Sequence, residues 1–329
     1  MKLVSILVAR DDAEVVDAHL TFHLNAGVDL VLAIDAASEG DTSEVLESFA
    51  RTGHVHIVPT ADGSDRRSDL AQLAVARHGA DWVLSADADE FWWPRGESLK
   101  DVVAAIPPRY EVVQGLVRVF PPRSGDEPFA ERMTARPSLH HLTDEAREPL
   151  PWALRPLYRA GQGRAVDPEL GSGSGRRMPL RAWYPIEVLR FPFRSLEQAE
   201  RRFREGLEPR STLEAEALEA FRRGSLAEWY EERAAADGER LVEDTRLRDA
   251  LGALRDGGPR PLLLKVPDIV DDASYAGECA AVGEVDLEAL ERQIVELEGR
   301  ITWLEERFWP RVLRQLSRLV PRRNRQATG

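Results

Sequence analysis

Short apolar runs alternate with amphipathic segments along the N-terminal part of the chain. The runs cover residues 3–9, 30–34, 55–58 and 82–84. Runs this short and this apolar are typical of strands buried on both faces, while the segments between them have helical spacing. Strand, helix, strand, helix in this order predicts an α/β fold with a mostly parallel, Rossmann-like sheet.

The middle of the chain is less regular. After Pro94, which is expected to stop a strand, the pattern predicts a helix over residues 98–105 and a strand over 112–120, and then a stretch rich in turn formers. Residues 154–190 show little periodicity. Their Gly-Ser-Gly-Ser-Gly segment at 171–175 is interpreted as a loop, because no predicted strand precedes it as a dinucleotide-binding fingerprint requires.

From residue 196 onward the chain is highly charged and its spacing is helical, with helices predicted over 213–223, 226–235 and 239–254. A heptad seam follows, made of Leu287, Leu290, Ile294, Leu297, Ile301, Leu304 and Phe308. The seam predicts a coiled-coil homodimer. The alternative is a helix that folds back onto its own core, which Trp303 and Trp309 favour because they lie off the seam.

These patterns divide the chain into an α/β core over residues 1–195, a helical region over 196–283, and a C-terminal helix with a basic tail over 284–329. The tail after Pro310 carries an apolar stripe among its basic residues. Such a stripe suits a weak contact with an anionic membrane surface.

Composition narrows the class of protein. The 329 residues carry a net charge of −13, which argues against a nucleic-acid partner, because proteins that bind nucleic acid present a basic surface. Cys279 is the only cysteine, so no internal disulfide can form and a reducing compartment fits. The apolar run at the N-terminus is too short for a signal peptide or a membrane span. We therefore expect a cytoplasmic protein.

Charged residues gather where the predicted strands end. They are Arg10, Asp11, Asp35, Asp87 and Asp89. In parallel α/β sheets, ligands bind outside the carboxyl ends of the strands, so this pattern predicts a site there. The alternative is that these residues only cap helices, as Asp11 or Asp12 could for the helix that follows.

The segment Ala-Asp-Trp-Val-Leu-Ser-Ala-Asp-Ala-Asp-Glu-Phe-Trp-Trp-Pro, residues 80–94, carries the most distinctive chemistry. On an extended backbone Asp87 and Asp89 point to the same side, and two carboxylates there suit a hard divalent cation that takes its other ligands from substrate phosphates. The aromatic residues 91–93 are expected to form a wall beside it. The competing interpretations are a solvated turn, a calcium loop, which Phe91 and Trp92 exclude, and a phosphatase motif, which would need threonine at Phe91.

These segments resemble the family 2-like glycosyltransferases of the GT-A fold, in particular an actinobacterial-type subgroup. The resemblance rests on residues 7–46, on the segment around Asp-Ala-Asp-Glu-Phe-Trp-Trp-Pro, on residues 187–206 with their Phe-Pro-Phe-Arg-Ser, and on residues 240–251. It extends from about Leu3 to about Leu254. It implies a GT-A core with a helical C-terminal region, and an enzyme that moves a sugar from a nucleotide-sugar donor to an acceptor, either a small molecule or a glycan.

The resemblance also implies roles for individual residues. The residues expected on the nucleotide-sugar are Arg10, Asp11, Glu14, Asp35, Asp87, Arg190 and Arg194. Asp87 and Asp89 would hold Mg²⁺ or Mn²⁺ against the diphosphate. Family members generally invert at the anomeric carbon with a carboxylate base, for which Asp144 and Asp167 are the candidates.

The chain departs from the family pattern at three places. Ala36 stands where asparagine is expected, Arg190 stands where histidine is expected, and the Gly-Ser-Gly-Ser-Gly region replaces a Gly-Asn-His segment. These departures leave open a second class, a catalytically impaired glycosyltransferase-like protein that acts as an oligomeric partner. A phosphatase or nucleotidyltransferase that uses the same carboxylates is a third.

Overall fold

The computed structural model describes residues 1–10, 12–36, 38, 40–59, 67–95, 98–137, 154–160, 177–178, 185–204, 209, 212–235 and 241–257. The chain divides into two units, Met1–Asp272 and Ala273–Gly329, and every described residue belongs to the first. The heptad seam and the basic tail therefore lie outside the described residues. The homodimer, the membrane contact and the three-part division of the chain stay predictions.

The described strands are β1 (Leu3–Ala9), β2 (Leu30–Asp35), β3 (Val55–Ile57), β4 (Trp82–Asp87), β5 (Glu90–Pro94), β6 (Val112–Val119), β7 (Ala135–Pro137), β8 (Leu154–Arg159), β9 (Ile186–Arg190) and β10 (Leu241–Glu243). The described helices are α1 (Ala13–Asn25), α2 (Thr42–Ala50), α3 (Arg67–His78), α4 (Leu99–Ala105), α5 (Phe129–Arg132), α6 (Leu196–Arg204), α7 (Thr212–Arg223), α8 (Leu226–Ala235) and α9 (Arg246–Gly257). Within this part of the chain, no helix is both long enough and apolar enough to cross a bilayer.

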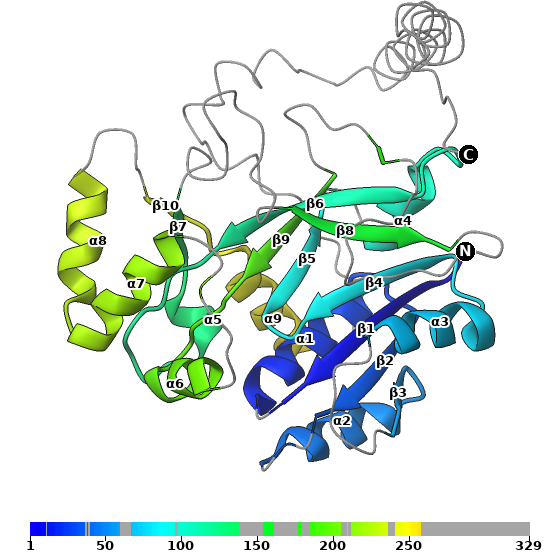
Figure 1. Cartoon of the computed structure of the whole chain (residues 1–329), viewed down its shortest axis with the longest axis horizontal. Coiled ribbons are helices and arrows are strands. Elements are labelled where there is room, and N and C mark those ends of the chain that lie inside the picture. The colour runs from blue at the N-terminus through cyan, green and yellow to red at the C-terminus, as the bar shows by residue number, and fades with distance from the viewer. Residues whose placement is uncertain are drawn as a thin grey trace, which may run out of the picture. The chain divides into compact units, whose positions relative to one another are not determined.

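One sheet organises these elements, and its strand order is β3-β2-β1-β4-β8-β6-β9-β5 (Figure 1). Strands β1 to β4 pair in parallel, as do β6 and β9. Strand β8 is antiparallel to both of its neighbours, and the edge strand β5 is antiparallel to β9. The predicted α/β core with a mostly parallel, Rossmann-like sheet is confirmed.

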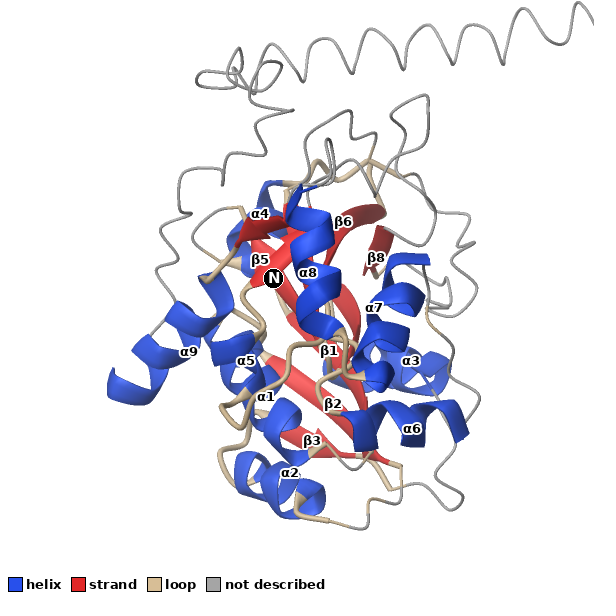
Figure 2. Ribbon diagram, turned by 90° about the vertical axis from the view of Figure 1, so that its left-hand side faces the viewer, coloured by secondary structure: helices blue, strands red, loops and turns tan. Residues whose placement is uncertain are grey.

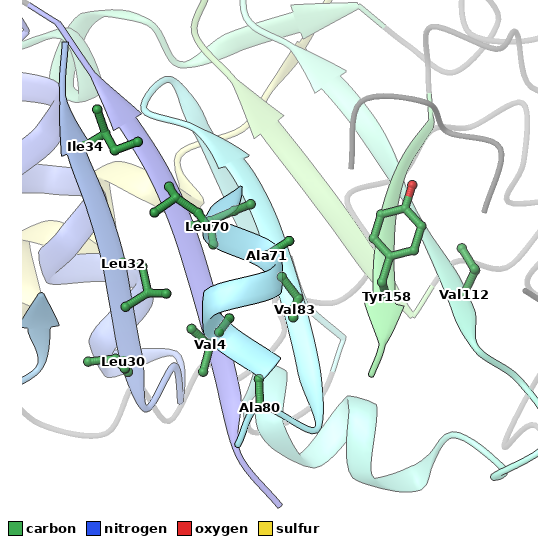
Figure 3. Close-up of a cluster of buried hydrophobic side chains, with 12 residues drawn as sticks. Val4, Leu30, Leu32, Ile34, Leu70, Ala71, Ala80, Val83, Val112 and Tyr158 are labelled. Atoms are coloured by element: carbon green, nitrogen blue, oxygen red, sulfur yellow. The ribbon is translucent and has the colours of Figure 1, made fainter. Parts of the chain in front are cut away.

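Helices cover both faces of the parallel half of the sheet, with α1 on one side and α3 on the other (Figure 2). Helix α3 places Leu70 and Ala71 against the buried side chains of β1, β2 and β4 (Figure 3). Burying a leucine side chain stabilises a fold by roughly 1.5–3 kcal/mol, so this apolar face is sufficient to hold α3 on the sheet. The opposite faces of the same strands pack against α1, which explains their continuous apolar runs.

The aromatic residues after Asp89 have a different role from the one predicted. Phe91, Trp92 and Trp93 lie in β5 and are 0–2% exposed, and the ring of Trp93 stacks on Phe22 of α1 at 5.7 Å. The prediction of an aromatic wall beside a site is therefore wrong. The rings of Phe91 and Trp93 pack against Phe22 of α1, whereas Trp92 points to the other face of the strand and lies near Gly115 of β6.

Two further segments differ from the sequence-based expectation. The irregular stretch over residues 154–190 contains β8 and β9, which are too short to show a clear period. The helix predicted over 239–254 is wrong at its start, where β10 pairs with β7 before α9 begins. Tertiary pairing overrides the helical propensity of the surrounding sequence there.

Strand β9 is anchored by a buried ion-pair network around Glu187. Its carboxylate accepts hydrogen bonds from Arg118 Nε at 2.7 Å, Arg246 Nη1 at 2.6 Å and Arg95 Nη2 at 3.2 Å. Burial alone would raise the pKa of Glu187, but the surrounding guanidinium groups outweigh burial and hold it well below its usual range. Because Glu187 lies three residues before Arg190, the network fixes the strand that carries Arg190.

Two glycine-to-alanine changes are expected to have opposite effects on stability. A Cβ at Gly115 in β6 would lie 2.9 Å from Val188 Cγ2, so Gly115→Ala should lower the free energy of unfolding by about 1–3 kcal/mol through overpacking. A Cβ at Gly252 in α9 would meet nothing within 4 Å, so Gly252→Ala should raise it by about 0.5–1 kcal/mol. Urea unfolding of both variants checks the pair. Equal shifts in the same direction would contradict this packing of β6 against β9.

Candidate functional site

The carboxyl ends of three neighbouring strands bring the predicted residues together. In the sheet register Ala9 of β1 pairs with Asp35 of β2, and Val8 pairs with Asp87 of β4. Arg10, Asp35 and Asp87 therefore lie at one edge of the sheet, as the sequence pattern predicted. The strand order reverses between β1 and β4, which makes this edge a topological switch point.

Asp35 is bound to its own loop. Its Oδ1 accepts a hydrogen bond from the backbone N–H of Ser38 at 2.9 Å, and its Oδ2 accepts one from Ser43 Oγ. Burial would raise the pKa of Asp35, but these hydrogen bonds outweigh burial and lower it. Asp35 thus holds the turn before α2 and presents an ionised carboxylate at the strand end.

Three residues around the start of α1 are tied to distant parts of the chain. Asp12 occupies the N-cap of α1 but makes no capping hydrogen bond, so that interpretation is wrong for Asp12. Its Oδ1 instead accepts from Arg194 Nη2 at 2.5 Å, because a buried guanidinium needs a carboxylate partner. Glu14 accepts the N–H of Phe129 at 3.1 Å, and Arg10 Nε donates to the carbonyl of Ala36 at 2.9 Å.

A tight turn at residues 88–89 joins β4 to β5. Because this turn is not extended, the expected alternation of side chains stops at Asp87, and the two aspartates differ in burial. His19 of α1 lies beneath the turn and its Nδ1 donates to the carbonyl of Ala88 at 3.2 Å. Burial lowers the pKa of His19 to about 4, so the ring is neutral at pH 7 and supports the turn as a hydrogen-bond donor.

Each aspartate of the turn binds a guanidinium group. Arg67 Nη2 of α3 donates to Asp87 Oδ1 at 2.6 Å. Arg202 Nη1 of α6 donates to Asp89 Oδ2 at 2.7 Å and also to the carbonyl of Pro192 at 2.7 Å. No pattern in the sequence marks either arginine as a partner of these aspartates, which lie 20 residues from Arg67 and 113 residues from Arg202.

Asp89 is 3% exposed, and within the described part of the chain its Oδ1 has no hydrogen-bond partner. Burial would raise the pKa of Asp89, but the charges of Arg202 and Arg190 outweigh both burial and the nearby charge of Asp87, and the pKa falls to about 2. The carboxylate is therefore ionised at any physiological pH, and its charge is balanced by arginine.

Arg190 belongs to the same buried cluster. It pairs with Glu90 in the register of β9 with β5, and its Nε lies 3.9 Å from Glu90 Oε1. Its Nη1 donates to Glu214 Oε1 of α7 at 2.5 Å. Glu90 also accepts from Arg155 Nε at 2.7 Å. Burial would lower the pKa of Arg190, but the charges of Glu214 and Asp89 outweigh burial and raise it. Arg190 is thus held as a fixed cation behind Asp89.

These surroundings do not fit a divalent cation held by Asp87 and Asp89. Each carboxylate already carries a guanidinium partner, and no three His, Cys, Asp or Glu side chains in the described part of the chain form a metal-ligand group. A divalent cation about 4 Å from a guanidinium is repelled by about 8 kcal/mol at an effective dielectric constant of about 20. Asp89 Oδ1 has no hydrogen-bond partner among the described residues, so it is the oxygen that could best bind a metal ion. It is buried, however, and it lies beside two arginines.

The expected site residues thus divide into two groups. The structure brings together Arg10, Asp35, Asp87, Asp89, Arg190 and Arg194 around the ends of β1, β2, β4 and β9, whereas Glu14 is bound to Phe129 of α5. Asp11, Asp144 and Asp167 lie outside the described residues, so their roles stay predictions. The sequence-based reasoning missed His19, Arg67, Arg155, Arg202, Glu90 and Glu214.

No protein-family model matches this chain, and no curated protein does. Among solved structures, the crystal structure of S. aureus TarS 1–349 is 16% identical, with 72% of this chain and 73% of that chain covered and a TM-score of 0.39. Its complex with UDP-GlcNAc is 15% identical, with 71% and 73% covered and a TM-score of 0.38. Glucosyl-3-phosphoglycerate synthase from Mycobacterium tuberculosis, in complex with phosphoglyceric acid, is 16% identical, with 40% and 46% covered and a TM-score of 0.24. These are likenesses of fold alone.

The buried pair of Asp89 and Arg202 should couple strongly. Arg202→Gln should lower the free energy of unfolding by about 3–5 kcal/mol, because it removes the hydrogen-bonded partner of a buried carboxylate. Asp89→Asn should cost less, because the partly exposed Arg202 can then turn to solvent. The double variant should lose about 1–3 kcal/mol less than the sum. The exposed pair of Glu219 and Arg223 is the control, with an expected coupling of about 0.3–0.5 kcal/mol. Urea unfolding of both cycles makes the comparison, and equal coupling in the two would contradict the buried clamp.

Proposed function

We propose that the chain is a glycosyltransferase that takes its sugar from a nucleotide-sugar donor bound at the carboxyl ends of β1, β2 and β4. The observation that carries this proposal is the position of Asp87 beside β1 at the topological switch point of the sheet. Nucleotides bind to open α/β sheets at such points. The resemblance of residues 80–94 to the centre of the GT-A glycosyltransferases supports the same conclusion.

The charges at this edge suit the two ends of such a donor. Asp35 and Asp87 offer carboxylate acceptors, which hydroxyl groups of a ribose or hexose can bind. Arg67 and Arg202 lie at the same edge, where their guanidinium groups suit the diphosphate. A site that offers carboxylates for sugar hydroxyl groups and guanidinium groups for a diphosphate fits a whole nucleotide-sugar better than it fits a free sugar or a free diphosphate.

The reaction is a single displacement at the anomeric carbon. An acceptor hydroxyl oxygen forms a bond to that carbon while the bond from the carbon to the donor phosphate oxygen breaks, and the electron pair leaves with the nucleoside diphosphate. A carboxylate base takes the hydroxyl proton, and configuration is inverted. Asp144 and Asp167 remain the proposed bases, and the acceptor is proposed to be a small molecule or a glycan.

A catalytically impaired relative is the second candidate, and one observation favours it. Arg190 stands where the family has a histidine, and it is buried in an ion pair with Glu214. If that histidine is required for transfer, the chain would bind a donor without turning it over. Release of free sugar from a bound donor separates the two candidates, since an impaired protein binds but does not hydrolyse.

Donor binding should depend on Asp87 and not on Asp81, which directly precedes the opposite end of the same strand. In a thermal-shift screen of UDP-, GDP- and dTDP-sugars, including UDP-GlcNAc, a donor at about 100 times its Kd should stabilise the wild type by about 2.7 kcal/mol. Asp87→Asn should weaken binding by about 1.5–3 kcal/mol, the range for a hydrogen bond to a charged group. Asp81→Asn should bind as the wild type does. No stabilisation by any donor, or equal losses in both variants, would contradict the proposed site.

A further inference from the structure

Arginine side chains neutralise the two aspartates of the site. Asp87 is bound by Arg67 and Asp89 by Arg202, at 2.6 and 2.7 Å, and the buried Arg190 adds a third positive charge near Asp89. A divalent cation would normally supply this charge and also bridge the aspartates to phosphate oxygens. Here guanidinium groups already supply the positive charge that the cation would bring to the aspartates.

Arg202 is built to reach a ligand while it holds Asp89. Both of its hydrogen bonds to described residues leave from Nη1, although a guanidinium carries five N–H donors in a planar fork. Its side chain is 19% exposed, whereas that of Asp89 is 3% exposed, so the arginine extends from the buried carboxylate toward solvent. Burial would lower the pKa of Arg202, but Asp89 outweighs burial and raises it, so the group stays charged.

Arg67 supplies a second guanidinium group near the turn, where its Nη1 also lies 3.5 Å from Ser85 Oγ. It reaches Asp87 from the first turn of α3, and its side chain is 18% exposed. The two arginines come from helices on different parts of the chain and meet at the two aspartates of one short turn. A diphosphate bound beside this turn would lie near two guanidinium groups, whereas a metal site would provide one cation.

We propose that Arg202, with Arg67, binds the donor diphosphate directly and replaces the divalent cation, while Asp87 and Asp89 hold these arginines in place. This inference rests on the proposed function and goes beyond it by assigning the counter-charge of the leaving group. As the bond from the anomeric carbon to the phosphate oxygen breaks, the electron pair moves to that oxygen, and the guanidinium groups stabilise the charge through charge-assisted hydrogen bonds.

The test is calorimetric titration of UDP, GDP and dTDP into the full chain, in EDTA and in MnCl₂. We expect at least one of them to bind with a Kd that differs less than twofold between the two conditions. Binding that requires Mn²⁺ would overturn the inference and leave the proposed function standing. Binding of none of them under either condition would overturn both.

Two matched variants of α6 sharpen the result. Arg202→Gln should weaken binding in EDTA at least tenfold, and Mn²⁺ should then restore part of the affinity, because Asp89 has lost its cation. Arg204→Gln, which removes an exposed arginine from the same helix, should bind as the wild type does. Arg202→Lys keeps the positive charge beside Asp89, so it remains a usable variant if Arg202→Gln does not fold. It should retain metal-independent binding with reduced affinity. Unchanged binding by Arg202→Gln in EDTA would overturn the role of Arg202.

Discussion

The carboxylate of Asp89 is buried and ionised, and the arrangement of the site follows from the need to neutralise it. An unpaired charge in such a position is costly, so a cation must accompany it. Arg202 meets this need from α6, and its second hydrogen bond, to Pro192, ties the helix to the end of β9. The ion pair therefore joins the turn after β4 to a helix more than a hundred residues later in the sequence.

The site also requires that its residues lie at one edge of the sheet, and the parallel half of the sheet provides this. Because β1, β2 and β4 are parallel neighbours, their carboxyl ends lie at one edge, and Asp35 and Asp87 flank the end of β1. The antiparallel half then brings β9 and β5 beside this edge and adds Arg190 behind the turn. The two halves of the sheet thus meet at Asp89, where we place the donor diphosphate.

The sequence predicted the parallel strand ends well and the cations that neutralise Asp89 poorly. Continuous apolar runs mark the buried strands, and strand-end charges such as Asp35 and Asp87 can be read directly from their positions. The partners of the aspartates could not be read in this way. Arg67 and Arg202 lie on charged helix faces that are indistinguishable from solvated ones until the sheet order brings them to the turn. For the same reason the aromatic residues 91–93 suggested a wall beside the site, although they belong to a strand whose two faces are covered.

A crystal structure of the chain grown with a nucleoside diphosphate and MnCl₂, with data collected at the manganese absorption edge, tests the central claim most directly. We expect the diphosphate at the carboxyl ends of β1 and β4, with phosphate oxygens at hydrogen-bond distance from Arg202 and no manganese signal beside Asp89. A nucleotide bound at another edge of the sheet would contradict the proposed site. A manganese ion bridging Asp87, Asp89 and the diphosphate would contradict its replacement by arginine.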